Sequence, residues 1–251
     1  MLIWTTVPEW TSRRKTLAGS IGFVPTMGAL HCGHASLMEK CRAENKIAVA
    51  SIFVNPSQFD DPTDLERYPR TLDRDLALLE GLGIDEVLAP PASELYPQGR
   101  RFRIEEDALT RSMEGFCRPG FFQGVMLIVL KLLNLVRAGR AYFGEKDYQQ
   151  LRVVRDLARE FFTGTEIIAC PTVREPSGLA ASSRNGLLAP AAREKAAALF
   201  RVLSSAPSPE TAFALLEAQG FIVDYIEEHW GRRFGAVRLE GVRLIDNVPL
   251  P

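Results

Sequence analysis

Short apolar runs alternate with helical patterns through the first two thirds of the chain, and this alternation limits the possible folds more than any other feature. Buried strands are expected at residues 21–24, 47–54, 84–88, 141–143 and 166–169. Helices are expected at residues 35–42, 72–82, 125–136 and 148–161. Repeated strand-helix units require right-handed crossovers, so the pattern predicts an α/β fold with a doubly wound parallel sheet.

The pattern changes after residue 172. A polar loop at 174–185 is followed by an Ala-rich helix expected at 190–203 and a Ser/Pro linker at 204–209. The tail then shows one more helix and several strand-like pieces, which predict a small α+β domain. We therefore expect a large domain over residues 1–173 and a smaller one over residues 174–251.

Charge and apolar content exclude several classes of protein. The 30 Lys and Arg residues against 31 Asp and Glu give a net charge of −1, so no extended basic surface for nucleic acid is expected. The most apolar stretch, 125–136, contains Lys131 and Asn134 and is shorter than the roughly 20 residues that span a bilayer. The four cysteines form no C-x-x-C pair. These features predict a cytoplasmic protein with reduced thiols and no membrane partner.

The first candidate loop, residues 25–34, follows a predicted strand and opens a helix. His31 and His34 lie three residues apart with Gly33 between them, so imidazoles and helix N-terminal N–H groups could together bind phosphate. Two alternatives stay open: a helix start with two surface histidines, and a zinc site that includes Cys32. The remaining histidine, His229, is expected at the surface.

Two further loops carry phosphate-binding residue types. In the loop 143–150, Asp147 and Gln150 resemble a capping box. The capping box does not account for Lys146, whose ammonium group could bind phosphate as a positive point charge. The loop 178–186 holds two hydroxyls and an arginine between glycines, which indicates either a mobile loop that closes over phosphate or an ordinary polar loop. The chain contains neither a P-loop nor a strand-borne G-x-G-x-x-G motif.

Five motifs in order resemble those of the pantothenate synthetase (pantoate-β-alanine ligase) family. They read FVPTMGALHCGH (23–34), SIFVNPSQF (51–59), YPRT (68–71), FGEKDYQQL (143–151) and LAASSRN (179–185). The segment RLIDN at 243–247 also fits. The resemblance implies a Rossmann-like nucleotide domain of the nucleotidylyltransferase superfamily and a small C-terminal domain that closes over the site.

The resemblance also implies a reaction. Pantoate and ATP would give pantoyl adenylate and pyrophosphate, and the amine of β-alanine would then displace AMP to form pantothenate, a precursor of coenzyme A. Magnesium would accompany ATP, and the protein would be a homodimer through the nucleotide domain, without nucleic acid as a partner. Attack of a carboxylate on phosphorus needs alignment and charge stabilisation rather than an enzyme nucleophile.

Site residues follow from the resemblance position by position. The residues implied to bind ATP are Met27, Gly28, Ala29, Leu30, His31, Cys32, Gly33, His34, Gly144, Glu145, Lys146, Asp147, Val173, Ala181, Ser182, Ser183 and Arg184. The catalytic set among them is His34, His31, Lys146, Ser182, Ser183 and Arg184. Gln58 and Gln150 would hold pantoate. The magnesium ligands stay open, because Arg74 separates Asp73 from Asp75.

Some residues depart from the family pattern. Phe121 occupies a position where the family often has histidine, which predicts repacking beside the pantoate pocket, and the C-terminal domain is expected to be short for the family. Two other functions therefore stay open. The chain could be a related nucleotidylyltransferase that acts on another carboxylate, or an inactive nucleotide-binding homologue.

Overall fold

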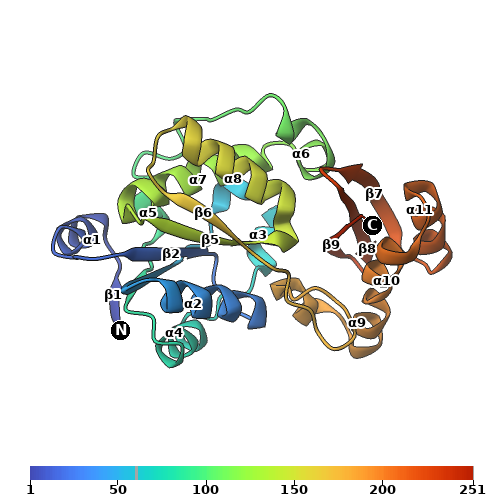
Figure 1. Cartoon of the computed structure of the whole chain (residues 1–251), viewed down its shortest axis with the longest axis horizontal. Helices are drawn as coiled ribbons and strands as arrows, with labels where there is room; N and C mark the ends of the chain where they lie inside the picture. The colour runs from blue at the N-terminus through green and yellow to red at the C-terminus, as the bar shows by residue number, and fades with distance from the viewer. Residues whose placement is uncertain (60–61, 251) are drawn as a thin grey trace. The chain divides into compact units, whose positions relative to one another are not determined.

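The computed structural model describes residues 1–59 and 62–250, which divide into two compact units (Figure 1). The first unit contains residues 1–144 and 149–170. The second contains residues 145–148 and the chain from residue 171 onward. The domain boundary expected between residues 173 and 174 stays a prediction, since compactness does not show that either part folds alone.

A six-stranded parallel sheet forms the centre of the first unit. Its strands, in spatial order, are β1 (Leu2–Trp4), β4 (Glu86–Leu88), β3 (Ile47–Ile52), β2 (Ile21–Thr26), β5 (Arg140–Gly144) and β6 (Glu166–Cys170). The chain builds outward from β2 to β4 in one direction and from β5 to β6 in the other, so the strand order reverses between β2 and β5. Ligands of such sheets bind at the carboxyl ends of the strands beside this reversal.

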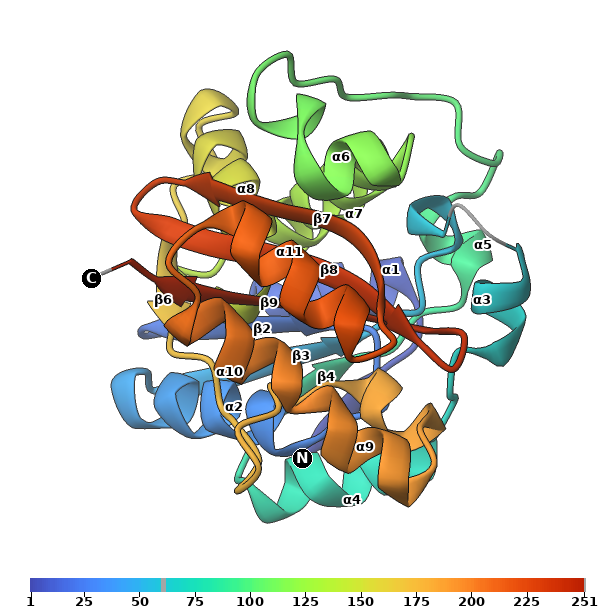
Figure 2. The same ribbon diagram turned by 90° about the vertical axis from the view of Figure 1, so that its right-hand side faces the viewer.

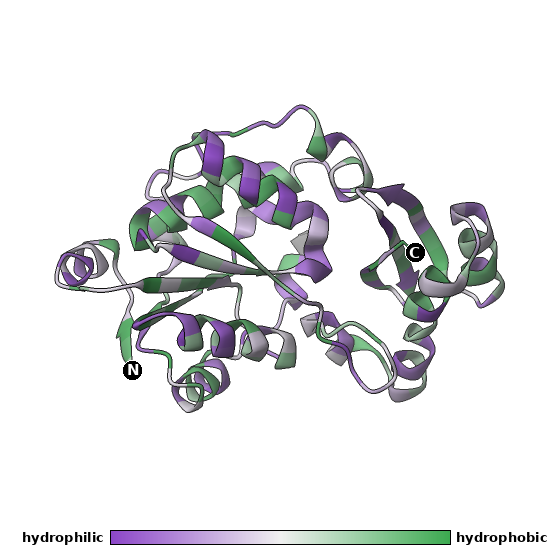
Figure 3. Cartoon of the chain, viewed as in Figure 1, coloured by the Kyte–Doolittle hydropathy of each residue, from purple (hydrophilic) through white to green (hydrophobic). Residues whose placement is uncertain are grey.

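Helices cover both faces of the sheet, which confirms the doubly wound α/β class (Figure 1). The helices are α1 (Val7–Arg14), α2 (Cys32–Glu44), α3 (Pro62–Arg67), α4 (Leu72–Gly81), α5 (Ala92–Leu95), α6 (Met113–Cys117), α7 (Phe121–Val136) and α8 (Tyr148–Glu160). Figure 1 shows α2 and α4 on one face and α7 and α8 on the other. The sheet strands are largely apolar, as buried parallel strands must be (Figure 3).

The face under α2 is packed closely because Gly22 of β2 has no side chain. A Cβ atom at this position would overlap Nδ2 of Asn45 and lie 2.6 Å from Sγ of Cys41. Asn45 Nδ2 instead donates to the hydroxyl of Tyr142, at 2.7 Å. Burial raises the pKa of the Cys41 thiol to about 12, so this cysteine is a neutral core residue.

An N-terminal strand and helix that the sequence pattern did not indicate attach to the edge of this sheet. Glu86 of β4, only 2% exposed, accepts hydrogen bonds from Nε1 of Trp4 (2.6 Å) and Nε of Arg13 (2.9 Å). Trp10 is fully buried and donates to the carbonyl of Leu135 at 2.9 Å. The segment is thus held by contacts distant in sequence rather than by its own periodicity.

The second unit is an antiparallel sheet covered by helices. Its strands are β7 (Ile222–His229), β8 (Arg232–Leu239) and β9 (Val242–Pro249). The helices are α9 (Pro190–Ala196), α10 (Ala198–Ser205) and α11 (Pro209–Ala218), all visible in Figure 2. The strands and helices together confirm the small α+β part.

Two expectations about this unit are wrong. The single helix expected at 190–203 is two helices that meet at Ala197, where the N–H bonds three residues back to Glu194 O in a tighter turn. The break lets Leu199 and Leu203 of α10 pack into the core of the unit. The linker expected at 204–209 is shorter, because α10 continues to Ser205 and α11 begins at Pro209.

In the described part of the chain, no helix has both the length and the apolar character needed to cross a membrane. The four cysteines are all free thiols.

The packing at Gly22 leads to a stability prediction. Gly22→Ala should lower the free energy of unfolding by about 1 to 3 kcal/mol, because the new methyl group must displace Asn45 or Cys41. The matched change Gly81→Ala places a methyl group in open space at the end of α4 and should leave stability unchanged or raise it by up to about 1 kcal/mol. Urea unfolding of both variants gives the comparison, and equal stability for the two would contradict it.

Candidate active site

The histidine loop after β2 fixes both imidazoles through their Nδ1 atoms. His31 caps α2, and its Nδ1 accepts the N–H of Gly33 at 3.1 Å. Nδ1 of His34 accepts the N–H of His31 at 3.4 Å, and the two ring centroids lie 4.1 Å apart. Because both Nδ1 atoms are acceptors, the proton of each neutral ring lies on Nε2. The loop therefore presents two imidazole N–H donors.

Two N–H groups at the start of α2 are bonded within the loop itself. The sequence predicted that helix N-terminal N–H groups would be open to phosphate, but those of His31 and Gly33 are already bonded to imidazole nitrogens. The binding of phosphate by this loop stays a prediction. For the zinc alternative, residues 1–59 and 62–250 contain no group of three His, Cys, Asp or Glu side chains that could hold a metal ion.

Asp75 of α4 anchors the same loop. Its carboxylate is 1% exposed and accepts the N–H groups of Ala29 and Leu30, each at 2.8 Å, and the hydroxyl of Thr71 at 3.1 Å. Ala29 (φ 50°) and Gly28 (φ 77°) both lie in the left-handed region, which an alanine adopts at a cost. The buried carboxylate compensates for this strain, so Asp75 anchors the loop.

Gln58 is brought into contact with the histidine loop by the turn after β3. Its Nε2 lies 2.9 Å from Sδ of Met27. Asn55, 1% exposed, orients it: Nδ2 of Asn55 donates to Gln58 Oε1 at 3.0 Å, and its Oδ1 accepts the hydroxyl of Tyr96 at 2.9 Å. Asn55 is missing from the predicted site, although an Asn-Pro pair directly after a buried strand was the signal that could have found it.

Phe121 is linked to Gln58 through Arg118. The guanidinium of Arg118 lies 3.9 Å from the centre of the Phe121 ring, and its Nη2 donates to the carbonyl of Gln58 at 3.2 Å. A cation over an aromatic face is a favourable contact. The residue that departs from the family pattern therefore packs against the arginine that holds Gln58.

Gln149 and Gln150 have different roles despite being neighbours. Nε2 of Gln149 donates to the carbonyls of Leu109 (2.7 Å) and Ser112 (3.0 Å), and its Oε1 accepts the N–H of Glu114 (3.1 Å). Gln150 is half-buried, and its amide bonds to no other residue in the described chain. Gln149 is therefore structural, and the pantoate-binding role of Gln150 stays a prediction.

Lys146 lies in the short helix η3 (Glu145–Asp147), which belongs to the second unit. Its Nζ is 3.5 Å from the carboxylate of Asp147. Nδ2 of Asn247 donates to the carbonyl oxygens of Glu145 and Lys146, each at 2.9 Å. The lysine is thus held through its backbone by a strand a hundred residues later in the chain.

The segment before Arg184, expected as either a mobile loop that closes over phosphate or an ordinary polar loop, contains a hydrogen-bonded hairpin. Backbone bonds from Ala181 N–H to Val173 O (2.9 Å) and from Glu175 N–H to Leu179 O (2.8 Å) form a short hairpin. Ser182 then caps η4 (Ser183–Leu187) by accepting the N–H of Arg184 at 3.3 Å. The predicted hydroxyl and guanidinium groups therefore start from a rigid turn.

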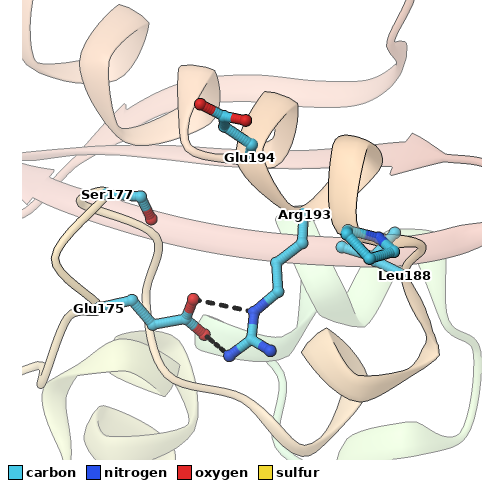
Figure 4. Close-up of a pocket in the computed structure, with 6 residues that line it drawn as sticks. Glu175, Ser177, Leu188, Arg193 and Glu194 are labelled. Atoms are coloured by element: carbon cyan, nitrogen blue, oxygen red, sulfur yellow. Dashed lines mark hydrogen bonds and ion pairs between the residues drawn. The ribbon is translucent and has the colours of Figure 1, made fainter.

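A pocket in the second unit lies behind this hairpin. It is lined by Glu175, Ser177, Leu188, Pro190, Arg193 and Glu194 (Figure 4). The ion pair between Glu175 and Arg193, at 2.8 Å, lies within it. Because none of the predicted site residues lines this pocket, it is not the candidate active site.

The predicted residues thus fall into two groups, one in each unit. Those of the first unit are Met27, Gly28, Ala29, Leu30, His31, Cys32, Gly33, His34, Gln58, Gly144 and Gln150. Those of the second unit are Glu145, Lys146, Asp147, Val173, Ala181, Ser182, Ser183 and Arg184. Their roles toward individual ligands stay predictions.

Comparison with known proteins decides the family. The model of the pantoate-beta-alanine ligase family matches residues 3–249. The chain belongs to this family. It is 48% identical to the pantothenate synthetase of Bdellovibrio bacteriovorus over 242 residues, 96% of each chain. It is also 48% identical to that of Legionella pneumophila strain Corby over 249 residues, which cover 98% of this chain and 99% of the relative.

Solved structures of family members have the same fold. The pantoate-beta-alanine ligase of Francisella tularensis, complexed with beta-gamma ATP and beta-alanine, gives a TM-score of 0.96 at 40% identity over 99% of this chain and 97% of that chain. The pantothenate synthetase of Thermus thermophilus gives 0.92 at 43% identity, over the full length of both chains. These relatives are matched over nearly their whole length. The expectation that the C-terminal domain is short for the family stays a prediction.

The Asp75 anchor leads to a second stability prediction. Asp75→Ala removes the acceptor for two loop N–H groups and should lower the free energy of unfolding by about 2 to 3 kcal/mol. The control Thr71→Ala removes a single hydroxyl contact to the same carboxylate and should cost about 1 kcal/mol. Denaturant unfolding measures both, and an Asp75→Ala variant as stable as the parent would show that the carboxylate does not anchor the loop.

Proposed function

We propose that this chain joins pantoate to β-alanine with ATP, giving pantothenate, AMP and pyrophosphate. Membership of the ligase family across residues 3–249 is the observation that supports this function most directly. The chain also retains the residues that the reaction needs: phosphate donors in the histidine loop and the Lys146 segment, and neutral amides at Gln58 and Gln150.

In the first step the carboxylate of pantoate attacks the α-phosphorus of ATP. A bond forms between a carboxylate oxygen and phosphorus, the bond to the bridging oxygen breaks, and pyrophosphate leaves with the electron pair. The Nε2–H groups of His31 and His34, both set by bonds at Nδ1, are suited to stabilise charge on the phosphate oxygens. Lys146 and Arg184 supply positive charge for the leaving pyrophosphate.

In the second step the amine of β-alanine attacks the acyl carbon of pantoyl adenylate. The C–N bond forms, the C–O bond to AMP breaks, and the amine loses a proton.

Gln58 and Gln150 are proposed to hold pantoate through its hydroxyl groups and carboxylate. Because amides carry no net charge, they orient the carboxylate without lowering its nucleophilicity as a fixed cation would.

Magnesium is proposed to enter with ATP as its counterion. Magnesium in nucleotide sites is commonly held by phosphate oxygens and water with one or two carboxylates. The Lys146 segment contains a carboxylate that suits this mode. The exposed carboxylate of Asp147, beside Lys146, offers a ligand for an ion that arrives on the triphosphate.

We further propose a homodimer in the cytoplasm. The family resemblance supports pairing through the first unit, where Leu2, Ile3, Phe161 and Phe162 are exposed apolar residues. The four free cysteines fit a reducing compartment. Light scattering would give twice the chain mass of 27.9 kDa for a dimer, and cell fractionation would give the location.

A coupled assay tests the proposed function. The protein is incubated with ATP, magnesium, D-pantoate and β-alanine, and AMP and pantothenate are measured against a reaction without pantoate. Formation of both products in equal amounts is expected. AMP release only with another carboxylic acid would favour a related nucleotidylyltransferase, and no AMP with any acid would indicate an inactive homologue.

The phosphate donors give a mutational prediction. His34→Ala and Lys146→Ala should each lower kcat at least about 100-fold, because each removes a donor from charge that develops in the transition state. The matched controls are His229→Ala and Lys40→Ala, which remove an imidazole paired with Glu227 and a lysine paired with Glu44. The controls should keep activity within about twofold. Circular dichroism checks folding, and unchanged turnover in either site variant would refute its role.

A further inference from the structure

Two consecutive polar residues, Asp246 and Asn247, are buried in β9 of the second unit. They are 4% and 1% exposed, and neither is among the residues predicted to touch a substrate. Polar groups buried in a strand destabilise the fold unless their hydrogen bonds are satisfied. Apolar side chains would also fill these buried positions. The hydrogen-bond partners of Asp246 and Asn247 therefore show what the polar side chains add.

Asn247 grips the backbone of the Lys146 segment. Its Nδ2 donates to the carbonyl oxygens of both Glu145 and Lys146, each at 2.9 Å. Its Oδ1 accepts Nε of Arg232 at 2.6 Å, which fixes the direction of the amide. Arg232 also lies 4.7 Å from the centre of the Tyr148 ring and 3.9 Å from the carboxylate of Glu145. Both ends of the segment that carries Lys146 are therefore held on β8 and β9.

Asp246 holds the hairpin that leads to Ser182. Its carboxylate binds the guanidinium of Arg174 in a two-point ion pair, at 2.6 and 3.0 Å. Arg174 also donates to the carbonyl of Gly178 at 3.1 Å and stacks 3.8 Å from the centre of the Phe200 ring. Charge-assisted, two-point bonds of this kind fix orientation as well as distance. Asp246 thus sets the hairpin from which η4 and Arg184 follow.

We propose that Asp246 and Asn247 are positioning residues, which lock the Lys146 segment and the Ser182 to Arg184 segment into one rigid set of phosphate-binding groups. This inference rests on the proposed function, because it assigns both segments to ATP. Two hydrogen bonds connect the contacts of Asp246 directly with those of Asn247. The N–H of Asn247 donates to Asp246 Oδ1 at 2.8 Å, and Arg174 Nη2 donates to the carbonyl of Asn247 at 3.4 Å. Groups that stabilise phosphate charge must be placed within a fraction of an ångström, which such a lock provides.

The test is Asn247→Ala, which removes the grip on Lys146 without adding charge. We expect kcat/KM for ATP to fall at least about tenfold while KM for pantoate changes less than about twofold. In a Lys146→Ala background the same substitution should change kcat/KM for ATP less than about twofold, because Asn247 acts through Lys146. The matched control Asp224→Ala removes a carboxylate that binds Arg238 and Arg243 on the same sheet, and its ATP kinetics should equal those of the parent.

Two outcomes would overturn the inference: a rise in KM for pantoate equal to the effect on ATP, or an undiminished loss in the Lys146→Ala background. If Asn247→Ala does not fold, Arg232→Lys provides the same test. That change leaves Asn247 in place but removes its Nε partner, and a smaller loss in the same direction is expected, whereas unchanged ATP kinetics would contradict the inference.

Failure of the proposed function is distinguishable from failure of this inference. If the parent protein releases no AMP, calorimetric binding of ATP to the parent and to Asn247→Ala replaces the kinetic assay. Binding at least about tenfold weaker in the variant would support the positioning role, and equal binding would overturn it.

Discussion

The histidine loop keeps its shape through one interaction, between the buried carboxylate of Asp75 and the N–H groups of a backbone that is left-handed at Gly28 and Ala29. A loop with two successive residues at positive φ turns its N–H groups inward, and buried N–H groups must find acceptors. Asp75 accepts two of them from a helix 45 residues further along the chain. With the loop shape fixed in this way, the N-terminus of α2 follows, and with it the orientation of both imidazoles.

The other segments of the candidate site are held in the same way, by a buried polar side chain that bonds to backbone or amide groups of a turn. Asn55 sets the turn that carries Gln58, and Asn247 sets the turn that carries Lys146. In each case the residue expected to meet the ligand is half-buried, while the residue that orients it is almost completely buried. Rigid placement of donors before the ligand arrives reduces the reorganisation needed in the transition state.

The sequence predicted those parts that depend on local patterns. The helix expected at 72–82 is Leu72–Gly81, and the strands beginning at residues 21, 47 and 166 start where expected. It missed β1, because a three-residue edge strand has no usable periodicity and its contact with Glu86 is distant in sequence. It missed α1, whose buried Trp10 bonds to the carbonyl of Leu135, also distant in sequence. It also missed the break at Ala197, since an unbroken run of helix-forming residues contains no stop signal.

The candidate site shows the same division. Motifs supplied the residues that would touch substrates, whereas Asp75, Asn55 and Asn247 did not enter the predicted site. Their partners are mostly backbone groups, which carry no side-chain signature, and for Asn247 they lie about a hundred residues away. Only the folded chain brings such partners together, so periodicity and spacing alone could not assign these roles.

The placement of residues 145–148 in the second unit has a consequence for synthesis of the protein. The chain passes from one unit to the other three times, after residues 144, 148 and 170. During translation the Lys146 segment leaves the ribosome about a hundred residues before Asn247, which at roughly 5 to 20 residues per second is a delay of about 5 to 20 s. Throughout that interval Asn247, the side-chain donor to the carbonyl groups of Glu145 and Lys146, has not yet been synthesised. Strand β9 therefore completes a segment made about a hundred residues earlier, and a protein truncated before Asn247 would lose the support of Lys146.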